Sequence, residues 1–89
     1  MIKSTHTAEY DALRAEIRAV REAAELSQRE LAAKLRVPHS WVAKVENGDR
    51  RIDLIEFFWI VTACGADPIS IAERLLKLAR RKEKGGRSR

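Results

Sequence analysis

Hydrophobic residues recur at spacings of three and four along most of this chain, which is the period of an α-helix. Leu13, Ile17, Val20 and Ala24 form the first such stripe, and the helix that carries them is predicted to span residues 7–25. No segment alternates hydrophobic and polar residues in the way that a half-buried β-strand does. The pattern therefore predicts a protein made only of helices.

Two short helices joined by a turn are predicted between residues 27 and 48. Ser27 and Glu30 have the spacing of a capping box, which begins a helix over 28–35. Pro38 lacks an N–H donor and suits the first turn of a second helix over 38–46, which Gly48 can end in the left-handed region. Two packed helices with so short a connection are typical of a helix-turn-helix, which places its second helix in the major groove of DNA.

Two further helices follow this pair. A fourth is predicted over 53–64, because Asp53 can cap it, and a fifth over 68–82, because Asp67 and then a proline precede it. Gly85 and Gly86 are expected to stop the fifth helix. The predicted fold class is all-α with five helices. We expect one domain over 7–82, a flexible N-terminus over 1–6 and a basic disordered tail over 83–89.

The two short helices resemble the Cro/C1-type (XRE) family of prokaryotic and phage helix-turn-helix regulators. The residues that carry the resemblance are Leu26-Ser27-Gln28, Glu30-Leu31-Ala32, Lys34-Leu35, Val37, Val42 and Val45-Glu46-Asn47-Gly48. It extends from Ile17 to Gly65 and implies a lambda-repressor-like DNA-binding domain. Arg36 stands where the family usually has glycine, so we expect a strained turn, because a non-glycine residue in the left-handed region costs roughly 1 kcal/mol.

The second helix of the motif is predicted to contact base edges. Val42 and Val45 point inward, which leaves a polar opposite face near the helix N-terminus. The predicted base contacts are His39, Ser40, Ala43 and Lys44. The resemblance implies His39, Ser40 and Lys44, and Ala43 is added because it lies on the same face. Two alternatives stay open: His39 as an ordinary surface residue, and Lys44 as a phosphate contact.

Phosphate contacts are expected around this face, from side chains that can donate to phosphate oxygens. The predicted set is Gln28, Arg29, Arg36, Trp41, Arg50 and Arg51. Trp41 is expected mainly to pack, with its indole N–H available to a phosphate. The resemblance further implies that Arg21 and Glu46 form a structural ion pair, which ties the second helix to the body of the domain.

The fourth predicted helix is hydrophobic almost all round, which suggests burial on every side. By resemblance, Leu54, Phe57, Phe58, Val61 and Cys64 occupy core positions. Ile55 and Trp59 occupy positions where the family tolerates polar residues, so we interpret them, together with part of the fifth helix, as a homodimer interface. The alternative is that the fifth helix folds back over Trp59 within one chain.

Composition places the excess positive charge at the end of the chain. Residues 1–76 hold eleven basic and twelve acidic residues, whereas 77–89 hold seven basic and one acidic. Within the motif, residues 28–51 carry six basic and three acidic side chains, a local excess that favours DNA phosphates. One cysteine, Cys64, excludes an internal disulfide. Together with the lack of a signal or membrane segment, it predicts a cytoplasmic protein. The expected DNA binding would associate it with the nucleoid.

No pattern indicates an enzyme, a metal site or a cofactor. The chain has only two histidines, far apart, and no glycine-rich phosphate loop. The predicted function is a sequence-specific transcriptional regulator, a homodimer on a pseudo-palindromic operator. Double-stranded DNA is the expected partner, with RNA polymerase as a further one. The alternatives are an antitoxin that binds a toxin protein and autoregulates through the same motif, and a protein-interaction module with a vestigial motif.

Overall fold

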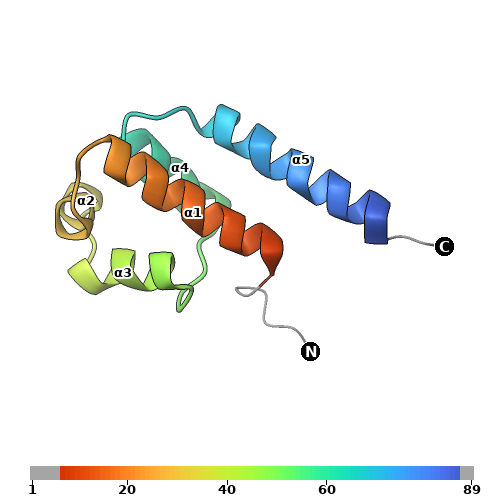
Figure 1. The fold of residues 1–89 in the computed structure, drawn as a ribbon. Coiled ribbons are helices and arrows are strands. Elements are labelled where there is room, and N and C mark those ends of the chain that lie inside the picture. Colours follow the sequence, from red (N-terminus) through yellow and green to blue (C-terminus); the bar gives the residue numbers. More distant parts are fainter. Residues whose placement is uncertain (1–6, 87–89) are drawn as a thin grey trace.

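The computed structural model describes residues 7–86, which fold into five helices with no strand among them (Figure 1). The helices are α1 (Ala8–Ala23), α2 (Gln28–Leu35), α3 (His39–Asn47), α4 (Leu54–Ala63) and α5 (Pro68–Gly86). The predicted all-α, five-helix class is confirmed. The predicted flexible N-terminus over 1–6 and the last part of the predicted tail, 87–89, lie outside the described residues.

Local capping explains where three of the helices begin. The Thr7 side chain accepts a hydrogen bond from the Tyr10 backbone N–H at the start of α1. Ser27 begins α2 and Asp53 begins α4, each in a complete capping box with the glutamate three residues later. Each box satisfies backbone N–H groups that have no partner within the helix. The predicted starting points of these helices are therefore confirmed.

Several helix boundaries differ from the prediction. The helix α1 ends at Ala23, two residues before the predicted end, and α3 and α4 each end within one residue of theirs. Pro38 is the cap residue before α3, with extended φ and ψ of −60° and 148°, rather than the first helical residue. The helix α5 continues to Gly86, four residues past the predicted end at residue 82. Glycine disfavours a helix interior by only about 1 kcal/mol, so Gly85 and Gly86 do not have to end it.

The helix α1 is central to the packing. It contacts α3, α4 and α5, while α2 contacts α3 and α4. Figure 1 shows α5 running alongside α1 in the opposite direction, with α3 on the other side of α1. The core consists of two clusters of buried side chains: Ile17, Leu31, Ala32, Val42, Val45 and Ile60 in one, and Phe57, Val61 and Ile71 in the other.

The predicted burial of α4 is partly wrong. Leu54 and Phe58, expected in the core, have 64% and 38% of their surface exposed. Leu54, the first residue of the helix, lines an open groove with Leu13 of α1 and Leu75 of α5, which do not close over it. Phe58 lies one turn later and is only partly covered. Trp59 is 55% exposed, so α5 does not fold over it as the alternative required. Within one chain, α4 keeps an open hydrophobic face.

Candidate nucleic-acid interface

The polar face of α3 is open. His39, Ser40 and Lys44 are exposed, and Ala43 between them is half-buried. On the opposite side of the helix, Val42 and Val45 are each only 1% exposed, in the main core cluster. Because the inward side is fixed by core packing, the outward side has a defined orientation relative to the body.

The turn between α2 and α3 has the strained geometry expected from its sequence. Arg36 has a φ of 60°, in the left-handed region, and its backbone N–H donates to the Ala33 carbonyl. The Val37 N–H donates to Ala32, which closes the end of α2. The turn therefore forms without glycine, at the cost of an unfavourable backbone conformation.

The predicted phosphate contacts divide into two groups. Arg29, Arg36 and Arg51 are exposed, whereas Gln28, Trp41 and Arg50 are partly buried. The first three have side chains open to solvent at the surface. The second three already pack or form hydrogen bonds within the chain.

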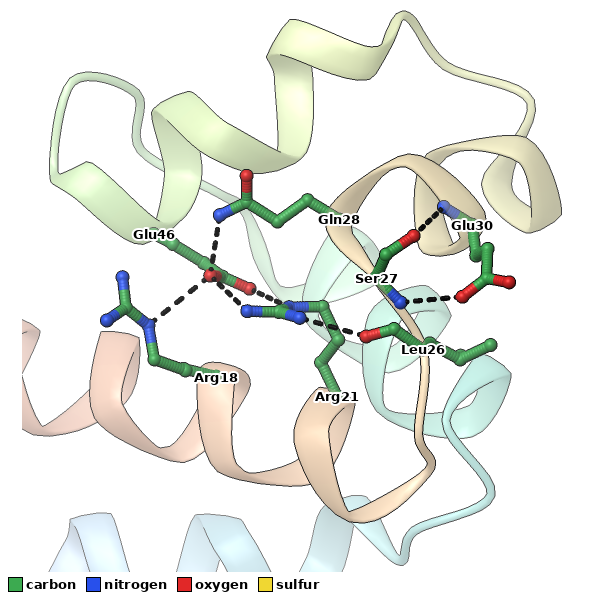
Figure 2. A network of polar contacts seen from close by, with 7 residues as sticks. All are labelled: Arg18, Arg21, Leu26, Ser27, Gln28, Glu30 and Glu46. Atoms are coloured by element: carbon green, nitrogen blue, oxygen red, sulfur yellow. Dashed lines mark hydrogen bonds and ion pairs between the residues drawn. The ribbon is translucent and has the colours of Figure 1, made fainter.

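A buried carboxylate, Glu46, ties α3 to the helices before it (Figure 2). Arg21 of α1 donates from Nε to Glu46 Oε2 at 2.7 Å and from Nη2 to Oε1 at 3.0 Å. Gln28 of α2 donates from Nε2 to the same Oε1 at 2.9 Å, and Arg18 Nε lies 3.4 Å from it. Arg21 also donates to the Leu26 carbonyl at 2.9 Å. The structure thus brings Arg21 and Glu46 together, and it adds Gln28 to the pair.

The ionised form of Glu46 is favoured despite its burial. Burial alone would raise the pKa of Glu46, because a low-dielectric environment disfavours the charge. The hydrogen bonds from Arg21 and Gln28, with the charges of Arg21 and Arg18, outweigh that effect and lower the pKa below its ordinary value. The carboxylate is therefore charged at neutral pH and holds three donors in place.

A second cluster joins the loop after α3 to α4, and the sequence did not predict it. Arg50 donates from Nη1 and Nη2 to the two carboxylate oxygens of Glu56, at 3.2 and 3.1 Å. Its guanidinium also lies 4.7 Å from the centre of the Trp41 ring. In the sequence, Glu56 is an acidic residue in the first turn of a helix, six positions after Arg50. This spacing is too common to predict an ion pair.

Tyr10 of α1 supports the same loop from the other side. The Ile52 backbone N–H donates to the Tyr10 hydroxyl oxygen at 2.7 Å. The Arg14 guanidinium lies 5.7 Å from the Tyr10 ring centre and packs beside Gly48, the residue that ends α3. The loop that follows the predicted DNA-reading helix is thus fixed by α1 as well as by α4.

Within residues 7–86, no group of three or more acidic, histidine or cysteine side chains could hold a metal ion. No helix in this part of the chain combines the length and hydrophobicity needed to cross a bilayer.

Comparison with known proteins identifies the motif. A family model described as a helix-turn-helix domain matches residues 12–76. A solved structure described as an XRE-family like protein from Pseudomonas syringae pv. tomato str. DC3000 is 41% identical, with a TM-score of 0.77 over 82% of this chain and 89% of that one. No curated protein matches the sequence.

Two more distant structures share the fold. One is the restriction-modification controller protein C.Esp1396I, described as a tetramer in complex with its natural 35 base-pair operator. It is 17% identical to this chain, with a TM-score of 0.70, and the match covers 81% of this chain and 95% of that one. The clp gene regulator ClgR from C. glutamicum is 22% identical, with a TM-score of 0.69 over 81% and 94%. The extent of the domain match and the 41% identity of the Pseudomonas protein establish the family. This chain belongs to the XRE family of helix-turn-helix DNA-binding regulators.

Proposed function

We propose that this protein is a homodimeric, sequence-specific transcriptional regulator that inserts α3 into the major groove of its operator. The observation that carries the proposal is the open polar face of α3 on a fixed backing. His39, Ser40 and Lys44 are exposed, while Glu46 of the same helix is tied to α1 and α2. A groove of DNA requires such a face, because base edges are read only when the donors arrive in a constant orientation.

The proposed base contacts have distinct chemistry. Lys44 can donate to guanine O6 or N7, and Ser40 can pair with several bases. His39 can donate to a base, and Ala43 can contact a thymine methyl group. These four residues lie within the first six positions of α3, the end of the helix that meets base edges in this motif.

The proposed phosphate contacts surround that face. Arg29, Arg36 and Arg51 are exposed cations, suited to neutralise phosphates and release counterions. Gln28 and Trp41 are proposed to add neutral N–H donors, from the start of α2 and from the side of α3. Arg50 is proposed for a different role, because its guanidinium is already paired with Glu56.

A homodimer through α4 is supported by exposed hydrophobic side chains. Ile55 and Trp59, one turn apart, are 52% and 55% exposed, and Phe58, 38% exposed, lies beside them on the helix surface. Large hydrophobic side chains that gather on one face are typical of protein interfaces. We expect Trp59→Arg to convert a dimer into monomers in light scattering, while circular dichroism stays unchanged. A dimer of unchanged stability would show that the subunits meet elsewhere.

Selection of bound sites from random duplexes tests DNA recognition directly. We expect a pseudo-palindrome with half-sites about 34 Å apart. Lys44→Ala should relax the preference at one base pair, at a cost of about 1–3 kcal/mol, whereas Arg51→Ala should weaken all sequences alike. Equal loss on every duplex for Lys44→Ala would make it a phosphate contact. Absence of any salt-sensitive DNA binding would refute the proposal.

The same α4 face is what an antitoxin would offer to its toxin. Stable co-purification with a second protein that covers Trp59, together with monomers in the purified chain, would favour that function over a homodimer. RNA polymerase is a further proposed partner, which transcription from the selected operator would test.

A further inference from the structure

Arg50 lies at the junction of three elements. It follows Gly48, which ends α3, by two residues, and its backbone N–H donates to the Lys44 carbonyl at 3.2 Å. Its guanidinium pairs with Glu56 of α4 and covers the ring of Trp41 of α3. Nη1 also donates to the Arg51 carbonyl at 2.6 Å. Arg50 therefore connects the predicted reading helix to the helix that carries the proposed dimer face.

Glu56 is itself held in place by the start of α4. Its Oε1 accepts a hydrogen bond from the Asp53 backbone N–H at 3.0 Å, and its own N–H donates to the Asp53 side chain at 2.8 Å. The carboxylate is thus part of a capping box before it meets Arg50. Because the carboxylate is held in place, a guanidinium that donates two hydrogen bonds to it is restricted to one orientation.

Trp41 transmits this orientation to α3. It is half-buried against the main core cluster, on the same helix as Ser40 and Lys44. The Arg50 guanidinium lies 4.7 Å from the ring centre, within the range of a cation–π contact. Because Trp41 neighbours Ser40 and precedes Lys44 by three residues, restraint of its ring restrains the rotation of the exposed face about the helix axis.

We propose that Arg50 is a positioning residue, which sets the orientation of α3 through Glu56 and Trp41, and not a phosphate contact. The proposal rests on the proposed DNA-binding function. A phosphate would have to replace a carboxylate that already satisfies two N–H groups of the guanidinium. The arginine side chain is only 36% exposed and that of Glu56 only 17%. The proposal also implies that operator affinity depends on a carboxylate, although a negative charge near DNA ordinarily weakens binding.

Glu56→Gln separates the two roles. Glutamine keeps an acceptor for the capping box but removes the charge that orients Arg50. If Arg50 positions α3, Glu56→Gln should weaken operator binding about tenfold, as for a lost interaction between contacting residues. The slope of log affinity against log salt should stay unchanged. If Arg50 binds phosphate, the same variant should tighten binding, because it removes a repulsive charge and releases the arginine; that result would overturn the proposal.

Changes at Arg50 itself give the second test. Lysine keeps the positive charge but not the planar fork, so Arg50→Lys should weaken binding as much as Arg50→Gln, with an unchanged salt slope. The matched control is the neighbouring Arg51→Gln, which should lower the slope by about one. Retained affinity in Arg50→Lys, with a reduced slope in Arg50→Gln, would make Arg50 a phosphate contact. Failure of the unmodified protein to bind any duplex would refute the proposed function instead.

A measurement without DNA keeps the positioning role falsifiable on its own. The chain has two tryptophans, so a Trp59→Phe background leaves Trp41 as the only one. In that background, Glu56→Gln and Arg50→Gln should both make Trp41 fluorescence more accessible to acrylamide quenching, while thermal unfolding remains cooperative. Unchanged quenching in both variants would show that the pair does not hold Trp41, and would overturn the proposal whether or not the variants bind DNA.

Discussion

Gly48 and Gly65 provide a matched pair for testing the structure of the region that follows α3. Both lie just after a helix in the left-handed region, with φ of 85° and 74°. They differ in their surroundings: a Cβ on Gly48 would lie 3.1 Å from Arg14 Cζ, whereas a Cβ on Gly65 would meet nothing within 4 Å. Substitution by alanine therefore introduces the same backbone strain at both positions and a side-chain conflict at only one.

The magnitudes follow from these two observations. An L-residue in the left-handed region costs roughly 1–2 kcal/mol, and alanine recovers about 0.4–1 kcal/mol by restricting the unfolded chain. Gly65→Ala should thus lower the free energy of unfolding by about 1 kcal/mol. Gly48→Ala also requires the Arg14 guanidinium to shift by a few tenths of an ångström, which weakens its contact with the Tyr10 ring, a contact worth about 0.5–1 kcal/mol in full. Its loss should therefore exceed that of Gly65→Ala by an amount that does not pass the full value of this contact.

Urea unfolding at one fixed protein concentration measures both losses, because dimer formation would otherwise change the apparent stability. In melting temperature, each kcal/mol corresponds to about 4–8 °C for a domain of this size. The control is Arg14→Ala, in whose background Gly48→Ala should cost no more than Gly65→Ala. Equal losses for the two glycines in the natural background would refute the close approach of Arg14, and no loss in either would refute the left-handed conformations.

Two further substitutions test the strained turn and the buried carboxylate. Arg36→Gly should raise the free energy of unfolding by up to about 1 kcal/mol, because glycine adopts the left-handed φ of 60° without strain. The same variant should weaken DNA binding, because it removes a proposed phosphate contact. A variant that is less stable in urea unfolding would contradict the strain at Arg36. Since the folded pKa of Glu46 lies below the ordinary value of 4.5, its contribution to stability is complete above pH 4.5 and is lost as the pH falls through the folded pKa. Glu46→Gln should therefore be less stable at pH 7 and lose less stability on acidification to pH 3, as urea titrations at both pH values would show; an acid dependence as steep as that of the natural protein would contradict the role of this carboxylate.

The helices and their starting points could be predicted from sequence because they depend on neighbouring residues. A capping box such as Ser27 with Glu30 is complete within four positions, and the hydrophobic spacing of α1 needs no knowledge of the other helices. The exposure of α4 could not be predicted in this way. Leu54 and Phe58 are as hydrophobic as Phe57, and only the packing of the other helices decides which of them is covered.

The partners of charged residues also could not be predicted from the sequence alone. A positive charge in the motif is compatible with a DNA phosphate, with solvent or with an internal carboxylate, and sequence alone does not distinguish these partners. The resemblance to a family supplied the pair of Arg21 and Glu46, because that pair belongs to the family pattern. No family pattern identified the partner of Arg50. Arg50 pairs with Glu56 because the loop between α3 and α4 brings the two side chains together.

These two charge pairs act on different parts of α3. Glu46, near its C-terminal end, is held by α1 and α2, and Trp41, near its N-terminal end, is covered by an arginine that α4 holds. The core packing of Val42 and Val45 already orients the helix, and a polar restraint at each end narrows the range of orientations that its exposed face can take. The second restraint comes from the helix that carries the proposed dimer face. If both proposals hold, a shift of α4 on subunit association changes the orientation of α3 relative to the DNA. Operator affinity then depends on the geometry of the dimer as well as on the number of contacts between protein and DNA.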